Sequence, residues 1–428
     1  MRFDKSCQAR APSAPDGPGV LRFTIFRGEA KKRKAAVSVA GRFCAVACFL
    51  RLGSAGLSRC PCYFSPMLER RIVVAVPARD EGAGVVATLR ALAAQEGAPP
   101  FQTLLLVNNS RDDTAAQARA FARQMPGFRL QVEEVALPPR EANVVGARRA
   151  ALDWAAALAG SDGIIVSTDA DTQAAPDWLA ALVQPLCANR AVQASAGRIL
   201  LRATERAALP EPVRRTYLLD TGYRDAASRL RARVLPDPFD PAPRHWQHFG
   251  ASLALRVSAY RAVGGVPQVP CLEDLALVRA LARADLPLRH TPRARVYTSA
   301  RLCGRVPVGL STQLGEWARG PQHWRVPGGA EVLRLAQAEA ALRRSWQARR
   351  LAPKLTAQWL TSEAALGAAL HAPRWGLALE RAHEVREAEG RWQRTFAPIP
   401  VWDALQEVRA LLSTLPEERP LTAEVCAP

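Results

Sequence analysis

The sequence lacks several features that would assign a chain to a well-known class. It has no run of about eighteen apolar residues, so nothing in it predicts a transmembrane helix. It has no CxxC pair and no zinc-finger spacing, which argues against structural zinc sites and dithiol redox centres. No repeat period is present, which argues against solenoids and propellers. We therefore expect an ordinary soluble globular protein.

The cysteines do not indicate a disulfide framework either. There are nine of them, and five precede Pro66. An odd number at irregular spacing is typical of reduced thiols, so we expect a cytoplasmic protein. The sequence leaves peripheral membrane contact open and does not indicate an oligomeric state.

The net charge of +19 invites comparison with nucleic-acid-binding proteins. Residues 1–66 hold 12 Lys and Arg against 3 Asp and Glu, so about half of the surplus lies in the first sixth of the chain. The rest is mostly arginine spread over helical stretches, without a basic-aromatic RNA-binding signature. We interpret this charge as a solvated surface and expect no nucleic-acid partner.

Residues 1–66 differ in character from the remainder. A basic KKRK starting at Lys31 precedes an apolar stretch that Arg42 interrupts, and the stretch is too short to span a bilayer. Met67 stands just before the first convincing strand. We expect residues 1–66 to be a basic, disordered extension, or an artefact if translation starts at Met67.

From Arg71 onward, short apolar runs alternate with helical stretches. The predicted strands are Arg71–Val76, Thr103–Val107, Leu130–Val135 and Gly163–Ser167. The predicted helices are Gly84–Gln95, Asp113–Gln124, Glu141–Ala159 and one that Pro176 opens at its first position. Such alternation predicts a parallel sheet with helices on both faces.

Beyond about Gln193 the pattern is looser. The predicted elements are a helical stretch at Glu205–Arg233, a Pro-rich loop, an apolar run at Ser252–Leu255, and helices at Val257–Val263 and Leu275–Arg283. From Gly328 the sequence predicts amphipathic helices. We therefore expect an α/β domain at residues 67–325 and a helical region at residues 326–428.

Three predicted strands end in acidic sequences, PARDE, NNSRDDT and TDADT. The acids there are Asp80, Glu81, Asp112, Asp169 and Asp171. Ligands of parallel sheets bind beyond the carboxyl ends of the strands, so these side chains are expected in one crevice. Carboxylates two residues apart can share one hard cation, Mn²⁺ or Mg²⁺, which neutralises charge on a leaving diphosphate. A DxD triplet alone is common, and it is the convergence that favours this interpretation.

Six segments resemble family 2 glycosyltransferases of the GT-A fold. They are VAVPARDE, LLLVNNSRDDTA, ANVVGARRAALD, IIVSTDADT, FGASLALRVSAYRAVGGVP and LEDLALVRAL, in the family's order over roughly residues 72–281. The resemblance implies a GT-A (Rossmann-like) mixed, mainly parallel sheet flanked by helices, here with a C-terminal helical extension. It also implies an inverting, hexosyltransferase-type enzyme that moves a sugar from a nucleotide-diphospho-sugar donor to an acceptor hydroxyl.

The same resemblance implies roles for single residues. Those implied to bind the nucleotide are Pro77, Ala78, Arg79, Glu81, Asn108, Asp112 and Asp169. Asp169 and Asp171 would hold the metal, and Asp274, paired with Glu273, would be the general base. A structural reading of that pair, two acids that complement a helix dipole, stays open.

Weaker candidates lie on the acceptor side. His245, Trp246 and His248 are candidates for contact with a sugar or acceptor ring, and Arg301 and Arg305 for contact with the diphosphate. His290 is the weakest candidate, as a further metal ligand. The family's processive synthases carry QxxRW, whereas this chain has QLGEW with Glu316, so we do not expect a processive enzyme.

Two other functions stay open. A nucleotidyltransferase shares similar sheet and metal chemistry, although PARDEGAG is unlike its Gly-rich phosphate loop. A noncatalytic nucleotide-sugar-binding protein is the second alternative, and the intact acidic pairs argue against it. The sugar, the nucleobase and the acceptor are set by loop shapes that motifs do not report.

Overall fold

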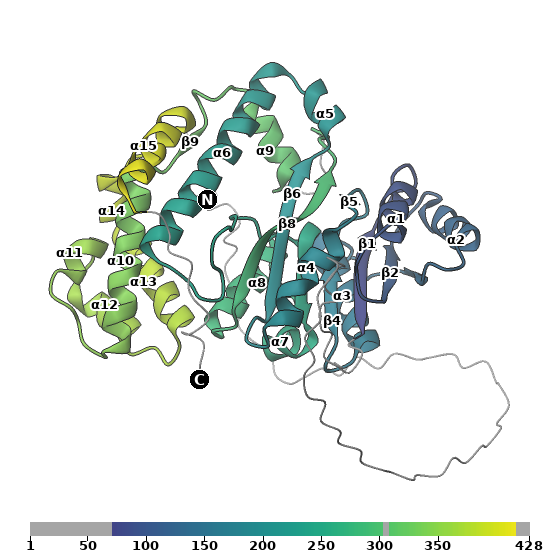
Figure 1. The fold of residues 1–428 in the computed structure, drawn as a ribbon, viewed down its shortest axis with the longest axis horizontal. Helices are drawn as coiled ribbons and strands as arrows, with labels where there is room; N and C mark the ends of the chain where they lie inside the picture. Colours follow the sequence, from purple (N-terminus) through teal and green to yellow (C-terminus); the bar gives the residue numbers. More distant parts are fainter. Residues whose placement is uncertain (1–70, 303–307, 417–428) are drawn as a thin grey trace, which may run out of the picture. The chain divides into compact units, whose positions relative to one another are not determined.

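The computed structural model describes residues 71–302 and 308–416. The expectations for residues 1–66 and for Arg305 lie outside these described residues. The described residues form an eight-stranded sheet with helices on its faces, followed by a group of helices in the last quarter of the chain (Figure 1). No helix in the described ranges is long and apolar enough to cross a membrane.

The first four strands form the parallel part of the sheet. They are β1 (Ile72–Ala78), β2 (Phe101–Asn108), β3 (Leu130–Val135) and β4 (Ile164–Ser167), side by side in the order β3-β2-β1-β4. In β1, Val74 and Val76 pack into one core, whereas Val73 and Ala75 pack into the other. A strand buried on both faces needs a continuous apolar run, which is why the sequence pattern of β1 was informative.

Helices cover both faces of this sheet, as expected. The helices α1 (Val85–Ala93), α2 (Thr114–Gln124) and α4 (Trp178–Ala188) contribute to one core. The helices α3 (Val144–Ala159), α7 (Val257–Ala262) and α8 (Glu273–Arg283) contribute to the other. Helix α3 begins after Asn143, whose side chain accepts a hydrogen bond from the Gly146 N–H at 3.0 Å and so caps the helix.

The second half of the sheet is mixed. Strand β7 (Leu253–Arg256) runs antiparallel between β4 and β6 (Ala194–Leu201). Strand β8 (Leu288–Thr298) pairs in parallel with β6, and the short β5 (Gln173–Ala174) forms the edge. The complete order is β3-β2-β1-β4-β7-β6-β8-β5. The predicted class, a mixed and mainly parallel sheet flanked by helices, is confirmed.

Two local predictions were wrong, and a proline explains the second. Pro176 is not the first residue of a helix, because it lies in a turn and α4 begins at Trp178. The stretch predicted as one helix at Glu205–Arg233 is two, α5 (Ala203–Ala208) and α6 (Glu211–Val234). The residue before a proline avoids helical angles, and Leu209 and Pro210 are both extended.

The C-terminal region is helical, as predicted, with short strand segments. Its elements are α9 (Leu310–Trp317), β9 (Arg325–Val326), α10 (Gly329–Gln347), α11 (Leu355–Trp359), α12 (Glu363–Leu370), α13 (Trp375–Glu389), α14 (Arg391–Thr395), β10 (Ile399–Pro400) and α15 (Val401–Thr414). Val332 of α10 and Leu405 of α15 share a core with Leu230 of α6. Helix α6 is therefore common to both parts, and the boundary at residues 325 and 326 stays a prediction.

Candidate active site

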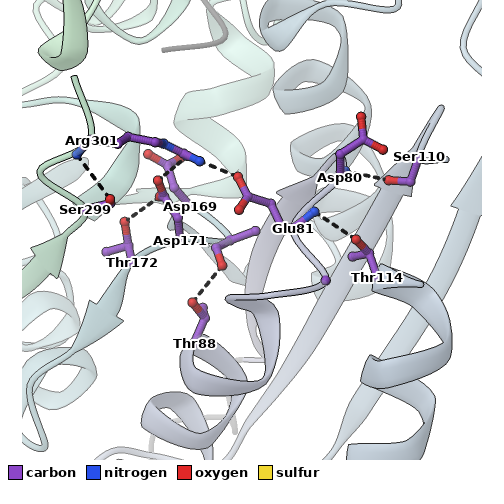
Figure 2. A network of polar contacts seen from close by, with 12 residues as sticks. Asp80, Glu81, Thr88, Ser110, Thr114, Asp169, Asp171, Thr172, Ser299 and Arg301 are labelled. Atoms are coloured by element: carbon purple, nitrogen blue, oxygen red, sulfur yellow. Dashed lines mark hydrogen bonds and ion pairs between the residues drawn. The ribbon is translucent and has the colours of Figure 1, made fainter. Parts of the chain in front are cut away.

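The loop after β1 is tied to the loop after β2. Pro77 and Ala78 are the last residues of β1, and Arg79 donates to the Ala142 carbonyl oxygen at 3.0 Å. Asp80 has a positive φ of 51°, its N–H donates to Ser110 Oγ at 2.9 Å, and the Glu81 N–H donates to Thr114 Oγ1 at 2.8 Å (Figure 2). These bonds hold the strained turn in place and direct both acids to the carboxyl end of the sheet.

Asp112 and Asn108 supply the β2 side of this edge. Asp112 Oδ2 accepts from the Gly82 N–H at 2.8 Å, and Oδ1 accepts from the Thr114 N–H at 3.1 Å. Burial raises the pKa of Asp112, but the hydrogen bonds from Thr114 and Gly82 outweigh it and lower the pKa overall. Asn108 is buried at the last position of β2. In this structure the Asp112 carboxylate holds two loops together.

Asp171 of the DxD pair meets the β1 loop through one arginine. Arg301 Nη2, beyond the end of β8, lies 3.1 Å from Glu81 Oε1 and also pairs with Asp171 Oδ2 (Figure 2). Thr88 of α1 donates to the Ala170 carbonyl oxygen at 2.8 Å, which fixes the DxD loop from the other side. The predicted convergence of the β1 and β4 ends is therefore present.

The charge around the DxD pair suits a cation. Burial raises the pKa of Asp171, and the charge of Asp169 raises it further, while Arg301 offsets only part of this. The Asp171 and Asp169 side chains are 18% and 34% exposed, so both remain open to a ligand. Among the described residues no group of three His, Cys, Asp or Glu could hold a metal. Two carboxylates, with the other positions left to water and phosphate oxygens, would fit an Mg²⁺-type ion.

The sequence interpretation missed Arg148, which lies at the centre of this site. Its side chain is 7% exposed, and its three nitrogens donate to Glu273 Oε1 at 2.8 Å, Ser167 Oγ at 2.8 Å and Asp169 Oδ1 at 2.9 Å. One signal was available, because Arg148 falls on the same helical face as the buried Val145 and Leu152. A charged residue on an apolar face needs a buried partner.

The acidic pair Glu273 and Asp274 opens α8, as predicted. Glu273 is buried, and Asp274 Oδ2 accepts from the Gly250 N–H at 2.8 Å. Burial raises the pKa of Asp274, whereas the charge of Arg148 acts in the opposite direction. Gly264 and Gly265 have φ of 81° and 77°, the left-handed conformation that favours glycine. A carboxylate with raised proton affinity is suited to general-base chemistry.

The acceptor-side candidates form an aromatic and imidazole cluster. The Arg224 guanidinium lies 4.7 Å from the Trp246 ring centroid, and Trp246 packs edge-on against Phe249 at 5.8 Å. His248 Nδ1 lies 3.3 Å from His290 Nε2. Burial lowers the pKa of His248 to about 4, so this ring is neutral near pH 7.

The other two histidines have protein partners. The His245 ring is buried against the Ala196 carbonyl oxygen at 3.2 Å, and burial lowers its pKa to about 3. His290 Nδ1 lies 2.8 Å from Asp240 Oδ2. Within the described part of the chain, no contact joins His290 to the DxD acids. Its role as a further metal ligand stays a prediction without support.

Comparison with known proteins gives a family match over part of the chain. Residues 73–222 match the model of glycosyl transferase family 2. The match includes β1 to β4 and the DxD acids, whereas Glu273 and Asp274 lie beyond it. No curated protein matches the sequence significantly.

Solved structures give more distant similarities. A mannosyltransferase from Pyrobaculum calidifontis, in complex with GDP-Man and Mn²⁺, is 19% identical, with 80% of this chain and 86% of that chain covered and a TM-score of 0.40. Glucosyl-3-phosphoglycerate synthase from Mycobacterium tuberculosis, in complex with phosphoglyceric acid, is 18% identical, with coverages of 62% and 80% and a TM-score of 0.36. The family similarity is therefore to glycosyl transferase family 2, over residues 73–222.

Proposed function

We propose that this protein transfers a sugar from a nucleoside-diphosphate sugar to an acceptor hydroxyl with inversion at the anomeric carbon. One observation carries the proposal. Asp169 at the end of β4 and Glu273 at the start of α8 are far apart in sequence, yet both accept hydrogen bonds from Arg148. The loop proposed to bind the donor and the acidic start of α8 therefore meet at one arginine, which supports transfer between two substrates held side by side.

The chain's own residues have separate roles in this proposal. Asp169 and Asp171 would hold a divalent cation, which when bound neutralises charge on the diphosphate. The loops after β1 and β2, with Pro77, Ala78 and Asn108, would hold the nucleoside. Arg301 would contact the same diphosphate, and its pairing with Asp171 supports this role.

Asp274 would be the general base. It takes the proton of the acceptor hydroxyl as that oxygen attacks the anomeric carbon. The bond from that carbon to the diphosphate oxygen breaks, and its electron pair stays on the leaving diphosphate. The Gly250 N–H at 2.8 Å from Oδ2 and the Leu275 N–H at 2.7 Å from Oδ1 orient the carboxylate. Attack opposite the leaving group inverts the anomeric configuration.

A thermal-shift screen of UDP-, GDP- and dTDP-sugars, with and without Mn²⁺, tests this function. We expect at least one sugar nucleotide to stabilise the protein in a Mn²⁺-dependent manner and to be hydrolysed slowly to the nucleoside diphosphate. Pyrophosphate release from a sugar 1-phosphate and a nucleoside triphosphate would indicate a nucleotidyltransferase instead. Tight binding with no nucleoside diphosphate release would indicate a noncatalytic binding protein.

A further inference from the structure

Arg148 joins three separate parts of the fold. Its Nη1 bonds the last residue of β4, its Nη2 bonds Asp169 in the DxD loop, and its Nε bonds Glu273 at the start of α8. All three bonds are 2.8–2.9 Å long. Because the guanidinium is planar, these bonds fix the position of Asp169 relative to the first turn of α8.

The charges explain why this arginine is buried. Asp169, Glu273 and Asp274 all act on the guanidinium of Arg148, so one buried cation faces three carboxylates. A buried cation without paired acids would be strongly unfavourable, and the same holds for buried acids without the cation. The group is therefore held together by its charges. A displacement of Arg148 would change the positions of both acidic motifs, the DxD loop and the start of α8.

Packing leaves the guanidinium no freedom. A Cβ at position 250 would lie 2.5 Å from both Cζ and Nη1 of Arg148, so any larger residue there would have to displace the guanidinium. The N–H of the same Gly250 donates to Asp274 Oδ2 at 2.8 Å. Arg148 thus lies directly against the backbone that orients the proposed base.

We propose that Arg148 is a positioning residue that sets the distance between the donor-binding carboxylate Asp169 and the helix that carries Asp274. This inference rests on the proposed function. Arg148 acts through Asp169 and Glu273, without touching donor or acceptor itself. Lysine in its place keeps the charge but cannot form three fixed bonds.

The decisive variant is Arg148→Lys, with Arg149→Lys as its matched control. Arg149 is the next residue of α3, is less buried, and donates to the Val266 carbonyl oxygen at 2.9 Å. For the sugar nucleotide that best stabilises the wild type, we would measure kcat and KM of nucleoside diphosphate release, and its Kd by calorimetry. Thermal unfolding establishes the folded fraction.

We expect Arg148→Lys to lower kcat about 100-fold, because a displacement of about 1 Å has effects of that size. The Kd should change less than about threefold, since the charge is retained. Arg149→Lys should keep the wild-type kcat. A wild-type kcat in folded Arg148→Lys, or an equal loss in Arg149→Lys, would overturn the inference.

Two further variants test whether Arg148 acts on α8 through Glu273, and they keep the inference testable if Arg148→Lys does not fold. Gly250→Ala keeps Arg148 but displaces it, and we expect a similar loss of kcat with little change in Kd. Because Arg148 acts on α8 through Glu273, Arg148→Lys combined with Glu273→Gln should lose little more than Arg148→Lys alone, and additive losses would contradict this. Failure of the proposed function looks different, because the wild type itself would then bind or cleave no sugar nucleotide.

Discussion

Two clusters of arginine and carboxylate in this protein differ in their charge balance. The crevice cluster consists of Arg148, Asp169, Glu273 and Asp274, and the helix cluster consists of Arg231, Glu339 and His383. In the helix cluster, Arg231 Nη2 lies 2.7 Å and His383 Nε2 lies 3.1 Å from the Glu339 carboxylate. One acid there has two basic partners, whereas in the crevice three acids share one arginine.

The pKa values differ in direction for this reason. Burial raises the pKa of Glu339, but the charge of Arg231 outweighs it and lowers the pKa to about 2. For Asp274 burial prevails over Arg148, and the pKa is raised. The helix cluster, in which the acid has basic partners, supports packing between α6, α10 and α13. A surplus of buried acid opposes folding and is typical of a site that awaits a cation or a proton.

The largest effect is expected for Asp274→Asn, which removes a base from the acid-rich cluster. Nucleoside diphosphate release should fall about 100- to 10,000-fold, the usual contribution of general-base catalysis. Sugar-nucleotide binding, measured by calorimetry, should be retained. Asp162→Asn, at an exposed loop position, is the control. Near-normal turnover of Asp274→Asn would remove this residue from the mechanism.

Glu339→Gln removes the negative charge from the helix cluster instead. We expect a loss of about 1.5–3 kcal/mol in the free energy of unfolding at pH 7, because the charge-assisted hydrogen bonds to the buried carboxylate are weakened while the Arg231 side chain, 37% exposed, stays partly solvated. Turnover per folded molecule should be unchanged. Chemical denaturation measures the loss, and Glu363→Gln at an exposed position of α12 is the control.

The same variant should also change the acid dependence of stability. A carboxyl group with a lowered folded-state pKa stabilises above its ordinary value of 4.5, and this contribution is lost as the pH falls towards about 2. The wild type should therefore lose more stability than Glu339→Gln over this range. Parallel curves for the two proteins would show that the pKa of Glu339 is the same in the folded and unfolded states.

Asp171→Asn tests whether the acids of the DxD loop hold the metal. If the surplus acid awaits a cation, Mn²⁺ with a bound sugar nucleotide should stabilise the wild type by about 2.7 kcal/mol at a hundred times the dissociation constant. The variant should lose this Mn²⁺-dependent gain. Asp177→Asn, whose side chain is 40% exposed, should keep it. Equal Mn²⁺ responses in all three proteins would place the metal elsewhere.

The smallest effect is expected for an exposed pair. Arg119 and Glu134 lie 2.6 Å apart with side chains 46% and 54% exposed. Arg119→Gln should change the free energy of unfolding by less than about 1 kcal/mol, because solvent screens such pairs. Denaturation in low and high salt checks this, and a loss comparable with that of Glu339→Gln would show that burial does not separate the two classes.

The first half of the fold was predictable because its signals are local. The strand Leu130–Val135 was predicted with its observed bounds, and β1 was found from its continuous apolar run. Strands β6 and β8 were missed because arginines interrupt their apolar pattern, as in RHTPRARVYT. Their strand conformation depends on pairing with each other, which one segment cannot report.

Local patterns were enough to predict which acidic residues follow the strands, because strand ends follow from local periodicity and the residues after them then share one edge of the sheet. Only the tertiary structure decided that Arg148 neutralises acids from both β4 and α8, and that Arg301 bridges Glu81 and Asp171. Such contacts join segments far apart in the chain. Charge pairing across that distance depends on how helices pack on the sheet, and no local pattern encodes it.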